Sequence, residues 1–141
     1  MDVLLNGSKW VGFENTEEGL ADLVGLSNLP EETVKVAWAE AEHKAYLADV
    51  KQECRSRIYA AASAETQMNM ATAAAVISAK EASARTEDEA SILSGLDDAI
   101  GWVAQMRARV IELADDAALD IGDDANWPPL PDGARDVVAK F

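Results

Sequence analysis

The stretch TEDEASILSGLDDAIGWVAQMRARVIELADDAA, residues 86–118, decides the fold of this chain. It opens with Thr86 followed three residues later by Glu89, which is the spacing of a helix capping box. Behind this cap, apolar side chains recur at alternate steps of four and three residues, so that they share one face of an α-helix. These positions are Ile92, Leu96, Ala99, Val103, Met106, Val110, Leu113 and Ala117.

A helix of this length needs partners along its whole apolar face. Roughly thirty residues at about 1.5 Å each give a rod of about 45 Å. We therefore expect the face to be covered by other helices, either from this chain or from other copies of it. The residues expected to form this interaction seam are Ile92, Leu96, Val103, Met106, Val110 and Leu113.

The region before this stretch predicts further helices, so the fold class is mainly α, a hairpin or bundle of long helices. One helix is expected from about Glu31 to about Ala61, and a second, over about 65–84, pairs antiparallel with the helix at 87–118. The sequence from Ala61 to Ala64 contains no helix breaker, and alanine favours a continuous helix. Ser63 could nevertheless cap a new helix, so both a break and a continuous helix stay open.

The N-terminal residues 1–29 differ from this bundle of residues 30–120 and are expected to form a docking arm. Asn6-Gly7 lies between short apolar segments, which predicts a β-hairpin with a tight turn. Thr16 is expected to cap a short helix behind it. An isolated hairpin is marginally stable, so Trp10 and Phe13 should anchor it on the helices, a neighbouring subunit or a partner.

The C-terminal residues 121–141 are predicted to form an extended, proline-rich arm. The segment from Trp127 to Gly133 contains three prolines and cannot continue a helix. A short helix is expected over the last residues, 134–141. The segment is either a mobile tail or an arm on a neighbouring molecule. Because Trp127 and Phe141 are costly to expose, we favour the arm.

Composition and charge exclude several classes of function. The 141 residues carry a net charge of −14, with a pI near 4.3. This charge repels phosphate backbones and anionic lipids, so neither nucleic acid nor a membrane is an expected partner. The N-terminus lacks the features of a signal peptide. Among the few basic residues, Lys51, Arg55 and Arg57 gather on one helix, where they either meet acidic residues of another helix or subunit or stay solvated.

No catalytic, metal-binding or cofactor-binding residues are predicted, and the chain is not expected to be an enzyme. Glu40 and His43 have the Glu-x-x-His spacing of di-iron bundles, but such sites need two of these motifs and this chain has one His. The lone Cys54 allows no internal disulfide and no Cys-based zinc site. The acidic loop lacks the pattern of an EF-hand calcium site; its residues are Asp120, Asp123, Asp124 and Asn126.

Two segments carry a resemblance to a known group of proteins. Arg57-Ile58 followed by Gln67-x-Asn69-Met70, and then Gly101-Trp102-Val103 with Met106-Arg107-Ala108, resemble a helical region of small tailed-bacteriophage tail and tail-fibre-associated proteins. The resemblance covers about residues 51–114. It implies a non-enzymatic virion structural protein, made in the host cytoplasm, whose partners are further copies of itself and other virion proteins. The alternatives are a capsid-attached decoration or fibre protein, and a soluble acidic assembly chaperone or adaptor.

Overall fold

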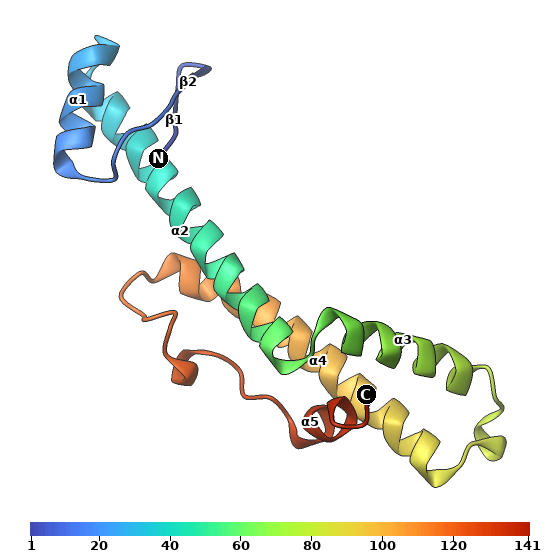
Figure 1. Ribbon diagram of the computed structural model, residues 1–141. Helices are drawn as coiled ribbons and strands as arrows, with labels where there is room; N and C mark the ends of the chain where they lie inside the picture. Colours follow the sequence, from blue (N-terminus) through green and yellow to red (C-terminus); the bar gives the residue numbers. More distant parts are fainter. The chain divides into compact units, whose positions relative to one another are not determined.

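The computed structural model describes all residues from Met1 to Phe141 and confirms the predicted fold class: mainly α with a small N-terminal hairpin (Figure 1). The chain divides into two compact units, Met1–Asp49 (unit 1) and Val50–Phe141 (unit 2). The elements in chain order are β1 (Val3–Leu5), β2 (Ser8–Trp10), α1 (Glu17–Ser27), α2 (Glu31–Ala61), α3 (Ala64–Ser78), η1 (Ala82–Ala84), α4 (Glu87–Asp115), η2 (Asp124–Asn126) and α5 (Asp132–Val138).

The boundary between the units lies inside α2, whereas the sequence suggested boundaries near residues 29 and 120. The proline-rich segment 121–141 is therefore part of the same compact unit as α3 and α4. Each unit is described by itself below.

The N-terminal hairpin forms as the Asn-Gly pair predicts. β1 and β2 are antiparallel, with Val3 opposite Trp10. Asn6 and Gly7 take φ values of 48° and 79°, the left-handed geometry that a two-residue hairpin turn requires. Thr16 then caps α1, its hydroxyl accepting a hydrogen bond from the amide of Gly19 at 3.1 Å.

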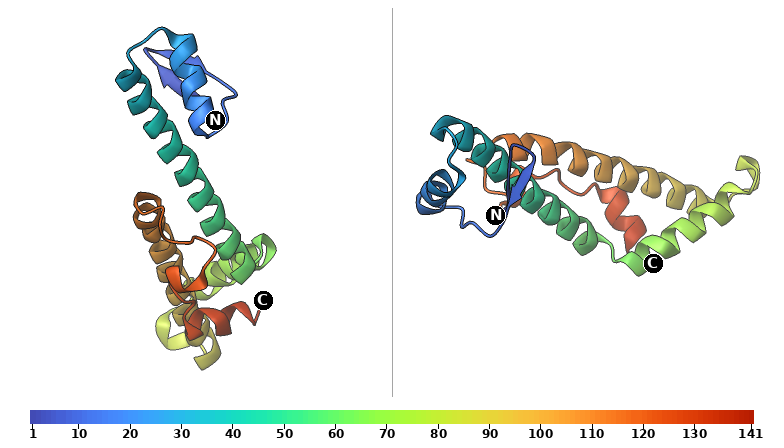
Figure 2. Two further views of the ribbon diagram at one scale, coloured as in Figure 1. Left: turned by 90° about the vertical axis from the view of Figure 1, so that its left-hand side faces the viewer. Right: turned by 90° about the horizontal axis from the view of Figure 1, so that it is seen from above.

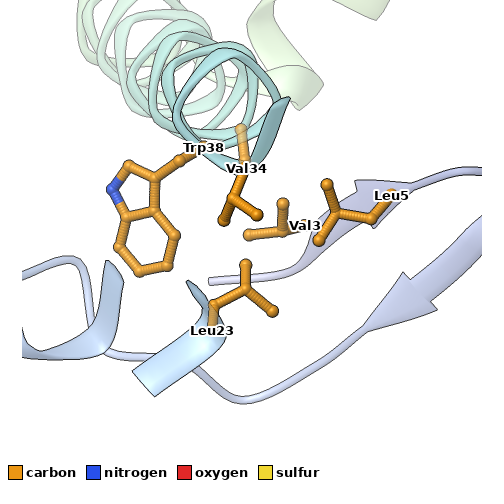
Figure 3. Close-up of a cluster of buried hydrophobic side chains, with 6 residues drawn as sticks. Val3, Leu5, Leu23, Val34 and Trp38 are labelled. Atoms are coloured by element: carbon orange, nitrogen blue, oxygen red, sulfur yellow. The ribbon is translucent and has the colours of Figure 1, made fainter. Parts of the chain in front are cut away.

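Unit 1 closes around one small apolar core. In Figure 3 the side chains of Val3, Leu23 and Val34 point toward one another from β1, α1 and α2. Trp38 covers one side of this cluster, and the ring of Phe13 meets it edge to face at a centroid distance of 6.3 Å. The hairpin therefore docks on helices of its own unit, with Phe13 and the half-buried Trp10 packed against the core.

Polar side chains decide the open question at residues 61–64: the helix breaks there. α2 ends at Ala61, and Ser63 caps α3 by accepting a hydrogen bond from the amide of Thr66 at 3.1 Å. Gln67 donates its side-chain amide to the carbonyl of Ala62 at 2.8 Å. Two local hydrogen bonds thus outweigh the helical preference of the alanines around them.

The α3–α4 hairpin is shorter at its ends than the sequence suggests. α3 stops at Ser78 rather than near 84, and a single 3-10 turn leads to the next helix. The predicted capping box is present, with Thr86 and Glu89 each bonded to the other's backbone amide. α4 ends at Asp115, three residues before the expected end.

The last helix, α5, packs on α4 (Figures 1 and 2). A Cβ added at Gly95 would lie 2.7 Å from both the carbonyl oxygen of Gly133 and Cβ of Val137, so glycine is what lets the two helices approach this closely. Val137 is buried in one cluster with Leu96 of α4 and Met70 of α3. The alternatives of a mobile tail and of an arm on a neighbour are thus both replaced by a segment that folds back on its own unit.

Candidate interaction surface

The seam on α4 is mostly buried within the chain. Leu96, Met106, Val110 and Leu113 are buried, and Ile92 and Val103 are half-buried. Near the start of α4, the cover comes from α3 and α5.

A C-terminal strap, which we define as residues 116–131, is held by polar contacts centred on Arg57 of α2. One terminal nitrogen of its guanidinium donates to Oδ1 of Asp124 at 2.6 Å, and the other donates to the carbonyl of Gly122 at 3.0 Å. The carboxylate of Glu53 lies 2.7 Å from Nε, and the group stacks over the ring of Trp127 at 5.3 Å. Partial burial lowers the pKa of Arg57, but the two carboxylates outweigh this and raise the pKa above its usual value. Arg57 therefore stays charged and fixes the strap.

Two indole groups and a second arginine complete this attachment. Trp102 of α4 donates its Nε1–H to the carbonyl of Pro128 at 2.9 Å, and Trp127 donates to that of Ile121 at 2.7 Å. Nε of Arg109 donates to the carbonyl of Asn126 at 2.8 Å. Of the four arm residues predicted for docking, Trp127 is thus buried in its own unit, while Phe141 remains 37% exposed.

Beside the covered seam, unit 2 leaves an open apolar groove of about 600 Å³. Its walls come from the end of α2, from α3, from α4, including Leu96 and Val103 of the seam, and from the C-terminal segment around α5. The side chain of Ile100 in this wall is 68% exposed. The other apolar residues that line the groove include Ile58, Met70, Ala74, Leu96, Val103, Leu130 and Val138.

One end of the open groove is cationic. A second hollow of about 460 Å³ shares Ile58, Gln67, Val103 and Arg107 with it, so the two adjoin. Its rim carries the cationic cluster, defined as Lys51, Arg55 and Arg107, and no carboxylate lines it. None of the three forms an ion pair with a carboxylate in the structure, whereas their neighbour Arg57 pairs with Asp124.

Cys54 lies in the wall of this cationic hollow and is 4% exposed. Burial raises the pKa of its thiol, and the nearby charge of Arg107 opposes this shift only in part. The thiol is therefore a poor nucleophile in the folded protein.

The polar residues considered for metal binding or catalysis are not assembled into a site. Glu40 and His43 are exposed. In the acidic loop, Asp120 and Asp123 accept hydrogen bonds from the amides of Gly122 and Ala125, and Asp124 is bound to Arg57. No group of three or more His, Cys, Asp or Glu side chains is arranged to hold a metal ion.

The sequence analysis missed the second apolar face of α4. Leu93, Ile100, Ala104 and Ile111 also fall at helical spacings and form a stripe beside the seam. Ile100 and Ile111 are 68% and 57% exposed. This stripe was visible as a second periodic set, but the sequence does not say which of the two faces the chain itself covers.

None of the helices combines the length and the apolar character needed to cross a bilayer. A comparison of the sequence with known protein families and with characterised proteins finds no match. The geometry of unit 2 is therefore the basis for the functional proposal.

Proposed function

We propose that this chain is a non-enzymatic structural protein of a bacteriophage virion, a tail or fibre component, that works by helix-mediated association with further copies of itself. The observation that carries the proposal is the open groove in unit 2, whose apolar wall a single chain leaves uncovered. The proposed activity is assembly, with the groove as the contact surface.

The continuous apolar lining of the groove, with Ile100 exposed in its wall, favours association on physical grounds. Single apolar side chains at a protein surface are ordinary. Here, however, they line a continuous depression formed by three helices and the C-terminal segment. Contiguous apolar surface of this kind marks interaction sites, because covering it releases about 25 cal/mol for each Å² removed from water.

The virion setting is supported by the resemblance of residues 51–114 to tail-associated helical regions. Three of the resembling positions have clear structural tasks in this chain: Gln67 fixes the α2–α3 corner, while Arg57 and Trp102 hold the strap. These tasks are those of a scaffold, which agrees with a structural role.

The association is tested on the purified full chain by sedimentation velocity over a series of concentrations. We expect a species larger than the 15.1 kDa monomer. Ile100→Ser, which makes the groove wall polar, should weaken association; Val76→Ser, at a similarly exposed position outside the groove, is the matched control. A monomer at all concentrations would contradict the proposal.

The virion setting is tested by quantitative mass spectrometry of purified phage particles from cells that make this chain. We expect the chain at a fixed number of copies per particle. Its presence in the lysate together with its absence from particles would contradict a virion component and favour the alternative of an assembly chaperone.

A further inference from the structure

We propose that copies of this chain associate head to tail: the cationic cluster at the end of the open groove in unit 2 receives an acidic helix face of unit 1 from another copy. This inference rests on the proposed self-association and assigns its two surfaces. It goes further by stating which parts meet and which symmetry follows.

The first surface is the cationic cluster. The chain contains 26 acidic and 12 basic residues, so a basic side chain normally has carboxylates available. Lys51, Arg55 and Arg107 nevertheless remain without one and gather around a hollow that also exposes Ile111. A binding partner of this hollow must therefore offer carboxylates for the three cations and an apolar side chain for Ile111.

The second surface is the outward face of α2 within unit 1, formed by Glu32, Val36 and Glu40. These residues are four positions apart, so they follow one another along one side of the helix, about 6 Å per step. Val36 is 61% exposed, Glu40 makes no ion pair, and Glu32 is paired with Lys35 of the same helix at 3.8 Å.

The local charges of the two surfaces favour this pairing between copies. Unit 1 contains ten acidic and three basic residues, whereas the cationic cluster gathers three basic side chains without a carboxylate in unit 2. A symmetric, groove-to-groove dimer would instead place the cationic clusters of both copies against each other, and like charges at an interface disfavour binding. When each copy uses its two complementary surfaces with two different neighbours, the contact is heterologous, and it forms a ring when the rotation closes and a filament when it does not.

The test uses charge reversal in the full-length protein, followed by sedimentation velocity at low and high salt. Arg55→Glu/Arg107→Glu should raise the dissociation constant about tenfold or more, and so should Glu32→Lys/Glu40→Lys. A chain carrying all four changes should associate again, and so should an equimolar mixture of the two double variants. Added salt should weaken the wild-type association, because it screens exposed charges.

The control is Arg135→Glu/Lys140→Glu, which gives the same change in net charge in α5 and in the residues just after it, outside the cationic cluster. It should leave association near the wild-type value. Far-UV circular dichroism checks that each variant keeps its helices, because some altered side chains make contacts in the wild type: Glu32 pairs with Lys35, Arg135 pairs with Asp132 and donates to the carbonyl of Leu130, and Lys140 pairs with Asp88.

The outcomes separate this inference from the proposed function. A monomeric wild type overturns both. An oligomer that is insensitive to Arg55→Glu/Arg107→Glu overturns only the head-to-tail contact. A groove-to-groove dimer would give a different result. Arg55→Glu/Arg107→Glu would then bind wild type more tightly than wild type binds itself, and Glu32→Lys/Glu40→Lys would have no effect. This result would also overturn the head-to-tail contact.

Discussion

The two units of the chain solve the same packing problem in different ways. Unit 1 surrounds Leu23 and Val34 so completely that neither is accessible to solvent. Unit 2 is built from alanine-rich helices and leaves Ile100 exposed in an open groove. In unit 1, the hairpin adds branched and aromatic side chains to a pair of helices, and these side chains close a small core. In unit 2, the small side chains of the helices leave a longer bundle open on one side.

The units also differ in how polar groups contribute to stability. All six arginines of the chain are in unit 2, and two of them hold the strap by donating to its carboxylate and carbonyl groups. Unit 1 contains no arginine and depends on apolar burial. Three pairs of substitutions and one single substitution follow, in order of decreasing effect.

The largest effect is expected when an equal apolar truncation is made in the closed core and in the open groove. Leu23→Ala should lower the free energy of unfolding by about 2–5 kcal/mol, because it leaves a cavity in a sealed core. Ile100→Ala should change the unfolding free energy of the monomer, at concentrations too low for association, by about 0.5 kcal/mol or less. Urea denaturation followed by circular dichroism measures both; equal costs would show that the groove is not open.

A smaller effect is expected from two neighbouring arginines of α2. Arg57→Ala removes the charged hydrogen bonds to the strap and should cost about 2–3 kcal/mol. Arg55→Ala loses only a cation–π contact with the exposed ring of Tyr59 and should cost less than about 1 kcal/mol. Limited proteolysis should cut residues 116–131 faster in the first variant alone; equal cutting in both would show that Arg57 does not hold the strap.

Two glycines on α4 test the close approach of α5. Gly95→Ala places a methyl group 2.7 Å from Val137 and should cost about 1–3 kcal/mol through overpacking. Gly101→Ala meets no atom within 4 Å and should stabilise the protein by up to about 1 kcal/mol, since alanine is the better helix former. Urea denaturation should therefore give opposite signs; a gain at Gly95 would mean that α5 is not seated there.

The smallest effect concerns the pH dependence of the capping box. The hydrogen bond from Lys80, and then that from the Thr86 amide, lower the pKa of Glu89 below its ordinary value of 4.5. The unfolded state therefore takes up this proton first, so the stabilisation is present above 4.5 and is lost as the pH falls through the lowered pKa. Thermal denaturation of Glu89→Gln should show a weaker acid dependence than wild type. An identical dependence would contradict the assignment.

The local parts of the fold could be predicted from the sequence because their signals lie within a few residues of each other. The capping box at Thr86 and the turn at Asn6-Gly7 are of this kind. The attachment of the strap could not be predicted, since Arg57 and Asp124 are 67 residues apart and no sequence pattern near either residue indicates that they pair. The same holds for Gly95, whose role depends on the distant Gly133 and Val137.

The candidate surface was predictable only in part for a related reason. Periodicity identified the seam on α4, and the gathering of Lys51, Arg55 and Arg57 was also apparent from the sequence. Which of these groups the chain itself would cover depends on where α5 and the strap settle. Arg57 forms an ion pair with Asp124, whereas Lys51 and Arg55 form none with a carboxylate. This difference depends on the three-dimensional arrangement alone.

The hydrogen bonds of Trp102 and Trp127 to backbone carbonyls have a spectroscopic consequence. Both indole protons are withheld from exchange with bulk water for as long as the residues around Ile121 and Pro128 stay in place. In a two-dimensional nitrogen–proton spectrum, these two resonances would report the loosening of the C-terminal segment, and they would do so before the helices themselves begin to melt.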